Sequence, residues 1–181
     1  VIVPADYHET KRAVMAALEL DSPVYIRFAR ESTPVFSRLD APFEVGKSIV
    51  LRDGTDVTLI AIGPMVYEAL IASGILGSKG ISCEVINAHT VKPFDENALL
   101  ASAAKTGHVI SVEEHQIIGG LGSTVAETLA ENYPVPLHRI GMDDKYGESG
   151  TAEELLDRYG LTGEHIAQTV LSSITDERGS I

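Results

Sequence analysis

The chain has 181 residues, of which 44% are hydrophobic and 22% charged, a composition typical of a globular domain or a domain with part of another. Its formal net charge of −12 argues against nucleic acid or an anionic membrane as a partner. No apolar run approaches the length of a membrane span. The single cysteine, Cys83, excludes an intrachain disulfide and a CxxC metal site, so we expect a buried thiol in a cytoplasmic protein.

The first 33 residues are expected to form a strand, a helix and a second strand. Val1-Ile2-Val3 has the pattern of the end of a buried strand, and Asp6 is expected to be the N-cap of a helix that runs to about Leu20. A second strand, 24–30, is expected to end at Arg30. Because the chain lacks both an initiator methionine and a signal peptide, we expect a fragment of a longer polypeptide. Residues 1–33 would be the end of a parallel α/β domain.

Residues 34–47 carry prolines and a glycine without periodicity and are expected to be a linker. From residue 48 to 181, strands alternate with helices, which predicts a three-layer α/β/α domain with a mainly parallel, mixed five-stranded sheet. The expected strands are 48–52, 56–62, 81–87, 108–112 and 136–140, and the expected helices are 64–76, 96–105, 124–132, 151–159 and 163–174. The first strand is a candidate antiparallel edge, Asp53-Gly54 a candidate hairpin turn, and Ser149 a candidate start for the helix at 151.

The stretch from Val109 to Ser123 is a buried strand, then Glu113-Glu114-His115, then a glycine-rich entry into a helix. Free N–H groups at such a helix start can hold an anion, which makes the turn a candidate ligand site. It can equally be a tight junction with both glutamates in solvent. The second interpretation is favoured because the full GxGxxG pattern is absent. His115 is a weak candidate for an active-site residue.

Arg30 is the strongest candidate for a binding residue. An arginine at the carboxyl end of a parallel strand faces the ligand crevice, and its guanidinium suits a phosphate or carboxylate. An ion pair with Glu31 or Asp40 is the equal alternative. The sequence contains no HExxH, P-loop or EF-hand motif, and its six histidines lack metal-ligand spacing. The chain therefore shows no complete catalytic constellation of its own.

The order of several short motifs resembles the C-terminal section of transketolase, a thiamine-diphosphate enzyme. The motifs are Pro4-Ala5-Asp6, Pro23 to Arg27 with Arg30, Asp53-Gly54 before Val57 to Ala61, Gly63, Val91 to Asp95, Val112 to His115, Gly119 to Ser123, and Asp144 to Gly150. Each is weak alone, but the ordered set covers nearly the whole chain. Forms in which this section is a separate subunit are the most similar.

The resemblance implies that residues 1–33 end a pyrimidine-binding domain and that residues 48–181 form the C-terminal domain. The complete enzyme would transfer a two-carbon ketol unit between ketose and aldose phosphates of the pentose phosphate pathway, using thiamine diphosphate and Mg²⁺ or Ca²⁺. The diphosphate motif and the cofactor-activating glutamate are absent from this sequence. We therefore expect no cofactor, metal or catalytic residue here, and an inactive isolated chain.

Arg30 corresponds to the arginine that binds the sugar phosphate in this family. The implied partners are sugar phosphates, the missing N-terminal section or subunit, and a second copy in a homodimer. Fragments of deoxyxylulose-phosphate synthase or of a 2-oxo-acid dehydrogenase β subunit are enzyme alternatives. A non-catalytic assembly or regulatory module is the alternative from another class.

Overall fold

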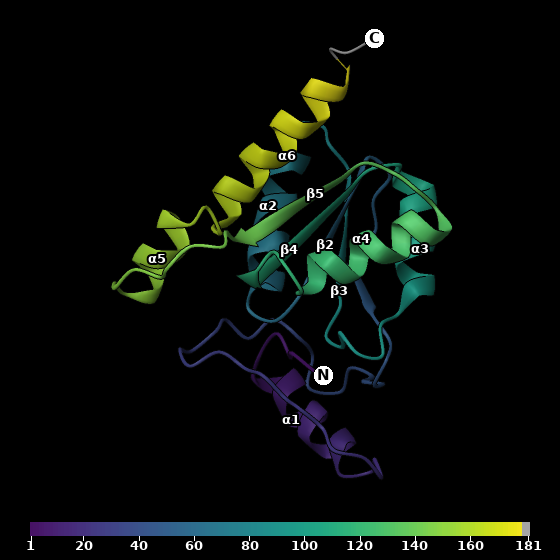
Figure 1. Ribbon diagram of the computed structural model, residues 1–181, viewed down its shortest axis with the longest axis vertical. Coiled ribbons are helices and arrows are strands. Elements are labelled where there is room, and N and C mark those ends of the chain that lie inside the picture. Colours follow the sequence, from purple (N-terminus) through teal and green to yellow (C-terminus); the bar gives the residue numbers. More distant parts are fainter. Residues whose placement is uncertain (179–181) are drawn as a thin grey trace.

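The computed structural model describes residues 1–178 and contains a five-stranded sheet in the order β1-β3-β2-β4-β5 (Figure 1). The strands are β1 (Ile49–Arg52), β2 (Val57–Ala61), β3 (Cys83–Asn87), β4 (Val109–Gln116) and β5 (Leu137–Met142). The helices are α1 (Tyr7–Ala17), α2 (Met65–Gly77), α3 (Glu96–Thr106), α4 (Leu121–Asn132), α5 (Ala152–Arg158) and α6 (Gly163–Arg178). This mixed sheet with helices on both faces confirms the predicted fold class.

The layers follow from the alternation of side chains along the buried strands. From β2, Leu59 packs with α2 and α6 in one apolar cluster, and the next residue, Ile60, packs with α3 and α4 in the other. Both faces of the central strands are therefore covered, as expected for parallel strands. Cys83 is 2% exposed in the first cluster, and burial raises the pKa of its thiol to about 11. This agrees with its prediction as a buried hydrophobic residue.

The predicted hairpin at Asp53-Gly54 is wrong. β1 pairs antiparallel with β3, whereas β2 lies on the other side of β3 and pairs with it in parallel. Residues 53–56 therefore carry the chain past β3. A Cβ on Gly54 would lie 2.2 Å from the backbone carbonyl carbon of Cys83, so glycine here allows a close passage under the neighbouring strand. The edge position predicted for β1 is confirmed.

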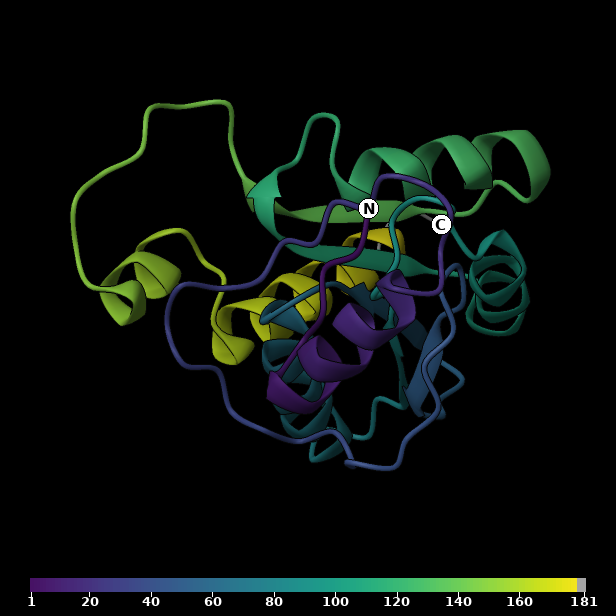
Figure 2. The same ribbon diagram turned by 90° about the horizontal axis from the view of Figure 1, so that it is seen from below.

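Helix ends follow local rules, with one correction. The Asp95 carboxylate accepts from the N–H of Ala98 at the start of α3, and Gly107 ends this helix in the left-handed region at φ 69°. Thr151, not Ser149, caps α5, and it forms a capping box with Glu154. Thr151 has the required glutamate three residues later, which is the signal that the prediction overlooked. The extended segment 143–150 before α5 arches away from the sheet (Figure 2).

The N-terminal unit docks at the carboxyl ends of the parallel strands, below the sheet in Figure 1. Ile2 forms a parallel bridge with Ile26 and an antiparallel bridge with Thr90. The two segments predicted as strands on either side of α1 therefore lie next to each other in parallel. They are paired only through isolated bridges and do not form regular strands. Ile2 is fully buried, and the Val3 N–H donates to the His89 carbonyl at 2.8 Å.

Polar contacts fix α1 and the predicted linker to the domain. The Asp6 carboxylate caps α1 through Glu9 N–H and accepts from the N–H and hydroxyl of Ser37. Burial by itself raises the pKa of Asp6, but these hydrogen bonds outweigh burial and hold the pKa below its usual value. Residues 34–47 contain no helix or strand, and Phe43 stacks on the buried ring of His89 at 4.2 Å. The linker thus runs along the surface as a docked segment.

Candidate functional site

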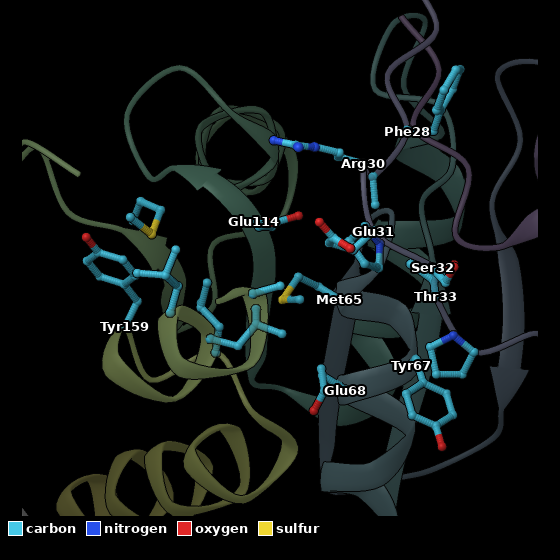
Figure 3. A pocket seen from close by; sticks show the side chains of 18 of the residues that line it. Phe28, Arg30, Glu31, Ser32, Thr33, Met65, Tyr67, Glu68, Glu114 and Tyr159 are labelled. Carbon is cyan, nitrogen blue, oxygen red and sulfur yellow. The ribbon is translucent and has the colours of Figure 1, made fainter. Parts of the chain in front are cut away.

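A cavity of about 590 Å³ lies where the N-terminal unit meets the carboxyl ends of the strands (Figure 3). Its charged lining includes Arg27 and Arg30 from the N-terminal unit and Glu114 from β4. Its apolar wall comes from α2, the end of β5 and the α5 region, with Met65, Met142, Leu155 and Tyr159 among the lining residues. The position matches the usual location of ligand crevices in α/β proteins.

Arg30 is exposed and borders this cavity, and its side chain extends toward the end of β4 in Figure 3. Asp40, one proposed ion-pair partner, binds Arg38 instead, at 2.9 Å. Among the side chains that the structure describes, those of residues 1–174, Arg30 has neither a hydrogen-bond nor an ion-pair partner, Glu31 included. The predicted strand end is displaced, because the pairing stops at Ile26 and Arg30 lies in a bend four residues further on. Its guanidinium is free to meet an anion.

The glycine-rich turn after β4 is filled by the side chain of Glu113. This carboxylate accepts from the N–H groups of Leu121 and Gly122, at 2.7 and 2.8 Å, at the start of α4. Glu113 is 2% exposed, so the expectation that both glutamates lie in solvent is wrong for this residue. Burial raises the pKa of Glu113, and the two backbone hydrogen bonds oppose the increase. The helix start therefore holds an internal anion, which leaves these N–H groups unavailable to a ligand.

Two glycines make this arrangement possible. Gly119 has φ 79°, in the left-handed region that favours glycine. A Cβ on Gly120 would lie 1.9 Å from Oε2 of Glu113 and would displace the carboxylate. The sequence signal was present, since an acidic residue precedes a glycine-rich helix start, but only the tertiary structure shows that the acid turns back into the helix.

The remaining candidates have local structural contacts. His115 is half exposed, and its Nδ1 lies 3.0 Å from the Gln116 carbonyl and 4.0 Å from Oε2 of Glu113. Within residues 1–174, whose side chains the structure describes, no group of three or more histidine, cysteine or acidic side chains is arranged to hold a metal ion. Since the start of α4 is filled by Glu113, its Leu121 and Gly122 N–H groups do not form a cradle for a diphosphate. No helix in this part of the chain is long and apolar enough to cross a membrane.

Sequence reasoning missed the contribution of Arg27. Its Nη2 donates to the backbone carbonyl of Glu114 at 2.8 Å, which joins the N-terminal unit directly to the end of β4. Only its place three residues before Arg30 in the sequence could have indicated such a role.

Comparison with known proteins places these features in a family. The transketolase C-terminal domain family matches residues 46–166. A 6-deoxy-6-sulfo-D-fructose transketolase subunit of Clostridium sp. (strain MSTE9) is 46% identical over 93% of this chain and 52% of its own length. A putative transketolase C-terminal section of Methanocaldococcus jannaschii is 44% identical over 98% of this chain and 56% of its own length. The chain thus spans about half the length of these curated relatives.

A solved structure described as a split-gene transketolase, in the form of an inactive tetramer of four beta chains, has a TM-score of 0.93. It is 43% identical, and the match covers 96% of this chain and 57% of that chain. A 1-deoxy-D-xylulose-5-phosphate synthase of Syntrophotalea carbinolica is 39% identical over 99% of this chain but only 29% of its own length.

Proposed function

Because the chain belongs to the transketolase C-terminal domain family, we propose that it is the C-terminal section of a transketolase-type enzyme. The complete enzyme would transfer a two-carbon ketol unit between ketose and aldose phosphates in the cytoplasm. Relatives described as transketolase subunits or sections, at 44–46% identity over more than nine tenths of this chain, support this proposal. The section itself supplies a substrate-phosphate contact and an assembly surface.

The observation that carries the substrate proposal is the free guanidinium of Arg30 at the cavity. A phosphate is the anion that best uses a guanidinium, because its oxygens accept two parallel hydrogen bonds. Arg30 has no competing carboxylate partner among the described residues, so binding a phosphate breaks no existing ion pair. Arg27 adds a second positive charge to the lining, whereas Glu31, Glu68 and Glu114 add negative ones, so a phosphate would depend on close contact with the arginines.

Thiamine diphosphate and its Mg²⁺ or Ca²⁺ would bind outside this chain, in the part of the enzyme that corresponds to the remaining half of the relatives. The filled helix start at Glu113 and the lack of a metal-ligand cluster among the side chains of residues 1–174 support this assignment. We expect no saturable binding of thiamine diphosphate when the isolated chain is titrated calorimetrically at micromolar concentration. Saturable binding would contradict the assignment.

A second candidate is the corresponding section of a deoxyxylulose-phosphate synthase. The 39% identity over 99% of the chain to such an enzyme favours it. The two candidates agree on a phosphorylated sugar as substrate. They differ in the acceptor chemistry of the complete enzyme, which residues outside this chain would determine.

The phosphate contact is tested by NMR titration of the chain with ribose 5-phosphate, with ribose as the unphosphorylated control. We expect Arg30→Ala to raise the Kd for ribose 5-phosphate at least tenfold, because a lost charge-assisted hydrogen bond costs roughly 1.5–3 kcal/mol. Arg52→Ala removes the same charge from the exposed end of β1, away from the cavity, and should leave the Kd unchanged. Equal changes of the Kd in the two variants would show that Arg30 acts only as a nonspecific charge and would overturn the proposal.

A further inference from the structure

We infer that Arg27 is a positioning residue that holds Arg30 at the phosphate site by binding the backbone of β4. The inference rests on the proposed function of Arg30. It starts from the segment that carries Arg30, which has few other attachments. Among the described residues, no hydrogen bond is made by any residue from Phe28 to Val35. The nearest anchors are Arg27 on one side and Phe36 on the other, where the Phe36 N–H donates to Asp6 at 3.0 Å.

Arg27 is a double anchor. Its backbone N–H donates to the Ile2 carbonyl at 2.9 Å, and its guanidinium donates to the Glu114 carbonyl at 2.8 Å. The first bond holds the segment to its own N-terminal unit. The second bond crosses to the C-terminal domain and is made three residues before Arg30. Without the bond to Glu114, no hydrogen bond would connect the N-terminal side of segment 28–35 to β4.

The acceptor lies next to an anchored side chain. Glu114 follows Glu113, whose buried carboxylate is bound to two N–H groups at the start of α4. The carbonyl that receives Arg27 therefore directly follows a residue anchored to α4, in the part of β4 where the pairing with β5 shifts register between Val112 and Gln116. The hydrogen bond from Arg27 to Glu114 thus gives the Glu113-Glu114 motif and the glycine-rich turn a shared structural role. Together they present a carbonyl to Arg27, and Arg27 fixes the position of Arg30.

The geometry favours positioning over direct phosphate binding by Arg27. One Nη of its guanidinium is already used by a carbonyl at hydrogen-bond distance, and the side chain is partly buried, whereas Arg30 is exposed and unpaired in the described structure. A lysine at position 27 keeps the charge and one donor, while a methionine keeps most of the apolar stem and loses both. The two substitutions therefore separate tethering from simple packing.

The test is an NMR titration of the full chain with inorganic phosphate, combined with ¹⁵N relaxation of residues 28–35. Arg27→Met should weaken phosphate binding roughly three- to tenfold, which corresponds to about 0.7–1.4 kcal/mol. It should also increase the fast backbone motion of residues 28–35. Arg27→Lys should recover most of the affinity and rigidity, and Arg52→Met, the charge-matched control, should alter neither.

The outcomes separate this inference from the proposed function. If the unmodified chain binds no phosphate, or if Arg30→Ala binds phosphate as tightly as the unmodified chain does, the proposed function fails and the inference falls with it. If Arg30→Ala abolishes binding but Arg27→Met leaves both affinity and motion unchanged, only the inference is overturned. Weaker binding in Arg27→Met with unchanged motion would make Arg27 a direct phosphate ligand and would also overturn the positioning role.

Discussion

Glu9 shows how a single buried carboxylate can oppose the stability of the interface that it helps to build. One oxygen accepts from the Ala5 N–H at 2.7 Å, and the other accepts from the Asn87 side-chain amide at 2.8 Å. Burial nevertheless raises the pKa of Glu9, so two hydrogen bonds do not fully replace its hydration. The amide oxygen of Asn87 is buried without a hydrogen-bond partner among the described residues.

We expect Glu9→Gln to stabilise the chain by roughly 1 kcal/mol at pH 7. The glutamine oxygen can accept from Ala5, and its amide can donate to the oxygen of a rotated Asn87. Because the folded-state pKa of Glu9 is raised, its stabilising contribution is present below its unfolded pKa and is lost as pH rises through the folded pKa. The advantage of glutamine should therefore be largest at neutral pH, decrease as pH falls through the raised folded-state pKa, and be smallest below about pH 4.5.

Urea unfolding of Glu9→Gln and the original chain between pH 4 and 8 measures this difference. Glu19→Gln, at an exposed site after α1, is the matched control and should change the free energy of unfolding little at any pH. A Glu9→Gln variant that is less stable at pH 7 would show that the ionised carboxylate is a net stabilising group.

At the scale of elements, the junction between β4 and α4 depends on a close approach between a glycine and a carboxylate. We expect Gly120→Ala to destabilise the fold by roughly 3 kcal/mol, because its Cβ would displace Glu113 and leave two buried N–H groups without their acceptor. Gly77→Ala is the control, since a Cβ at the end of α2 meets nothing within 4 Å. It should be neutral or slightly stabilising.

Chemical denaturation measures both variants, and a double-variant cycle identifies the cause. In a Glu113→Ala background, Gly120→Ala should cost less, because the carboxylate that it displaces is gone and only the 2.9 Å approach to the Gln116 carbonyl oxygen remains. Equal costs in the two backgrounds would place the strain in the turn backbone instead of in the contact with Glu113.

The elements that sequence patterns predict well are those whose signals are local. The apolar strands β2 and β3 and the helix α3 depend on neighbours in the chain, and all three elements are confirmed. The partner of β1 is a distant strand, and Asp53-Gly54 carries the same local signal whether it closes a hairpin or crosses under β3. The burial of Glu113 and the tether of Arg27 also depend on segments that only the complete fold brings together.

At the scale of the whole molecule, the N-terminal unit and the C-terminal domain form one packed structure. Ala5 belongs to the apolar cluster on one face of the sheet, and Val3 belongs to the cluster on the other face. Glu9 and Arg27 form hydrogen bonds at the ends of β3 and β4. The cavity with Arg30 exists only because both units border it. The phosphate site proposed at Arg30 would therefore depend on this docking, and the boundary proposed at residues 34–47 separates units that fold against each other.

The whole chain also presents surfaces for assembly, and we expect a symmetric dimer through the C-terminal domain, residues 48–181. Isologous contacts are the commonest solution for homo-oligomers, and the similar split-gene transketolase is described as a tetramer of β chains. A net charge of −12 makes the copies repel each other, so the dimer should be stronger at about 0.15 M salt than at low ionic strength.

Sedimentation equilibrium across the micromolar range tests the dimer, and one variant tests its location. The exposed face of α1 is a competing surface, because Tyr7, Met15 and Leu18 are 68%, 57% and 73% exposed on it. A dimer formed by residues 48–181 should persist in Leu18→Glu, since a charge on α1 leaves that contact intact. Loss of the dimer in Leu18→Glu would place the contact on α1. A single species of monomer mass in the original chain at every concentration would exclude both surfaces as stable interfaces of the isolated chain.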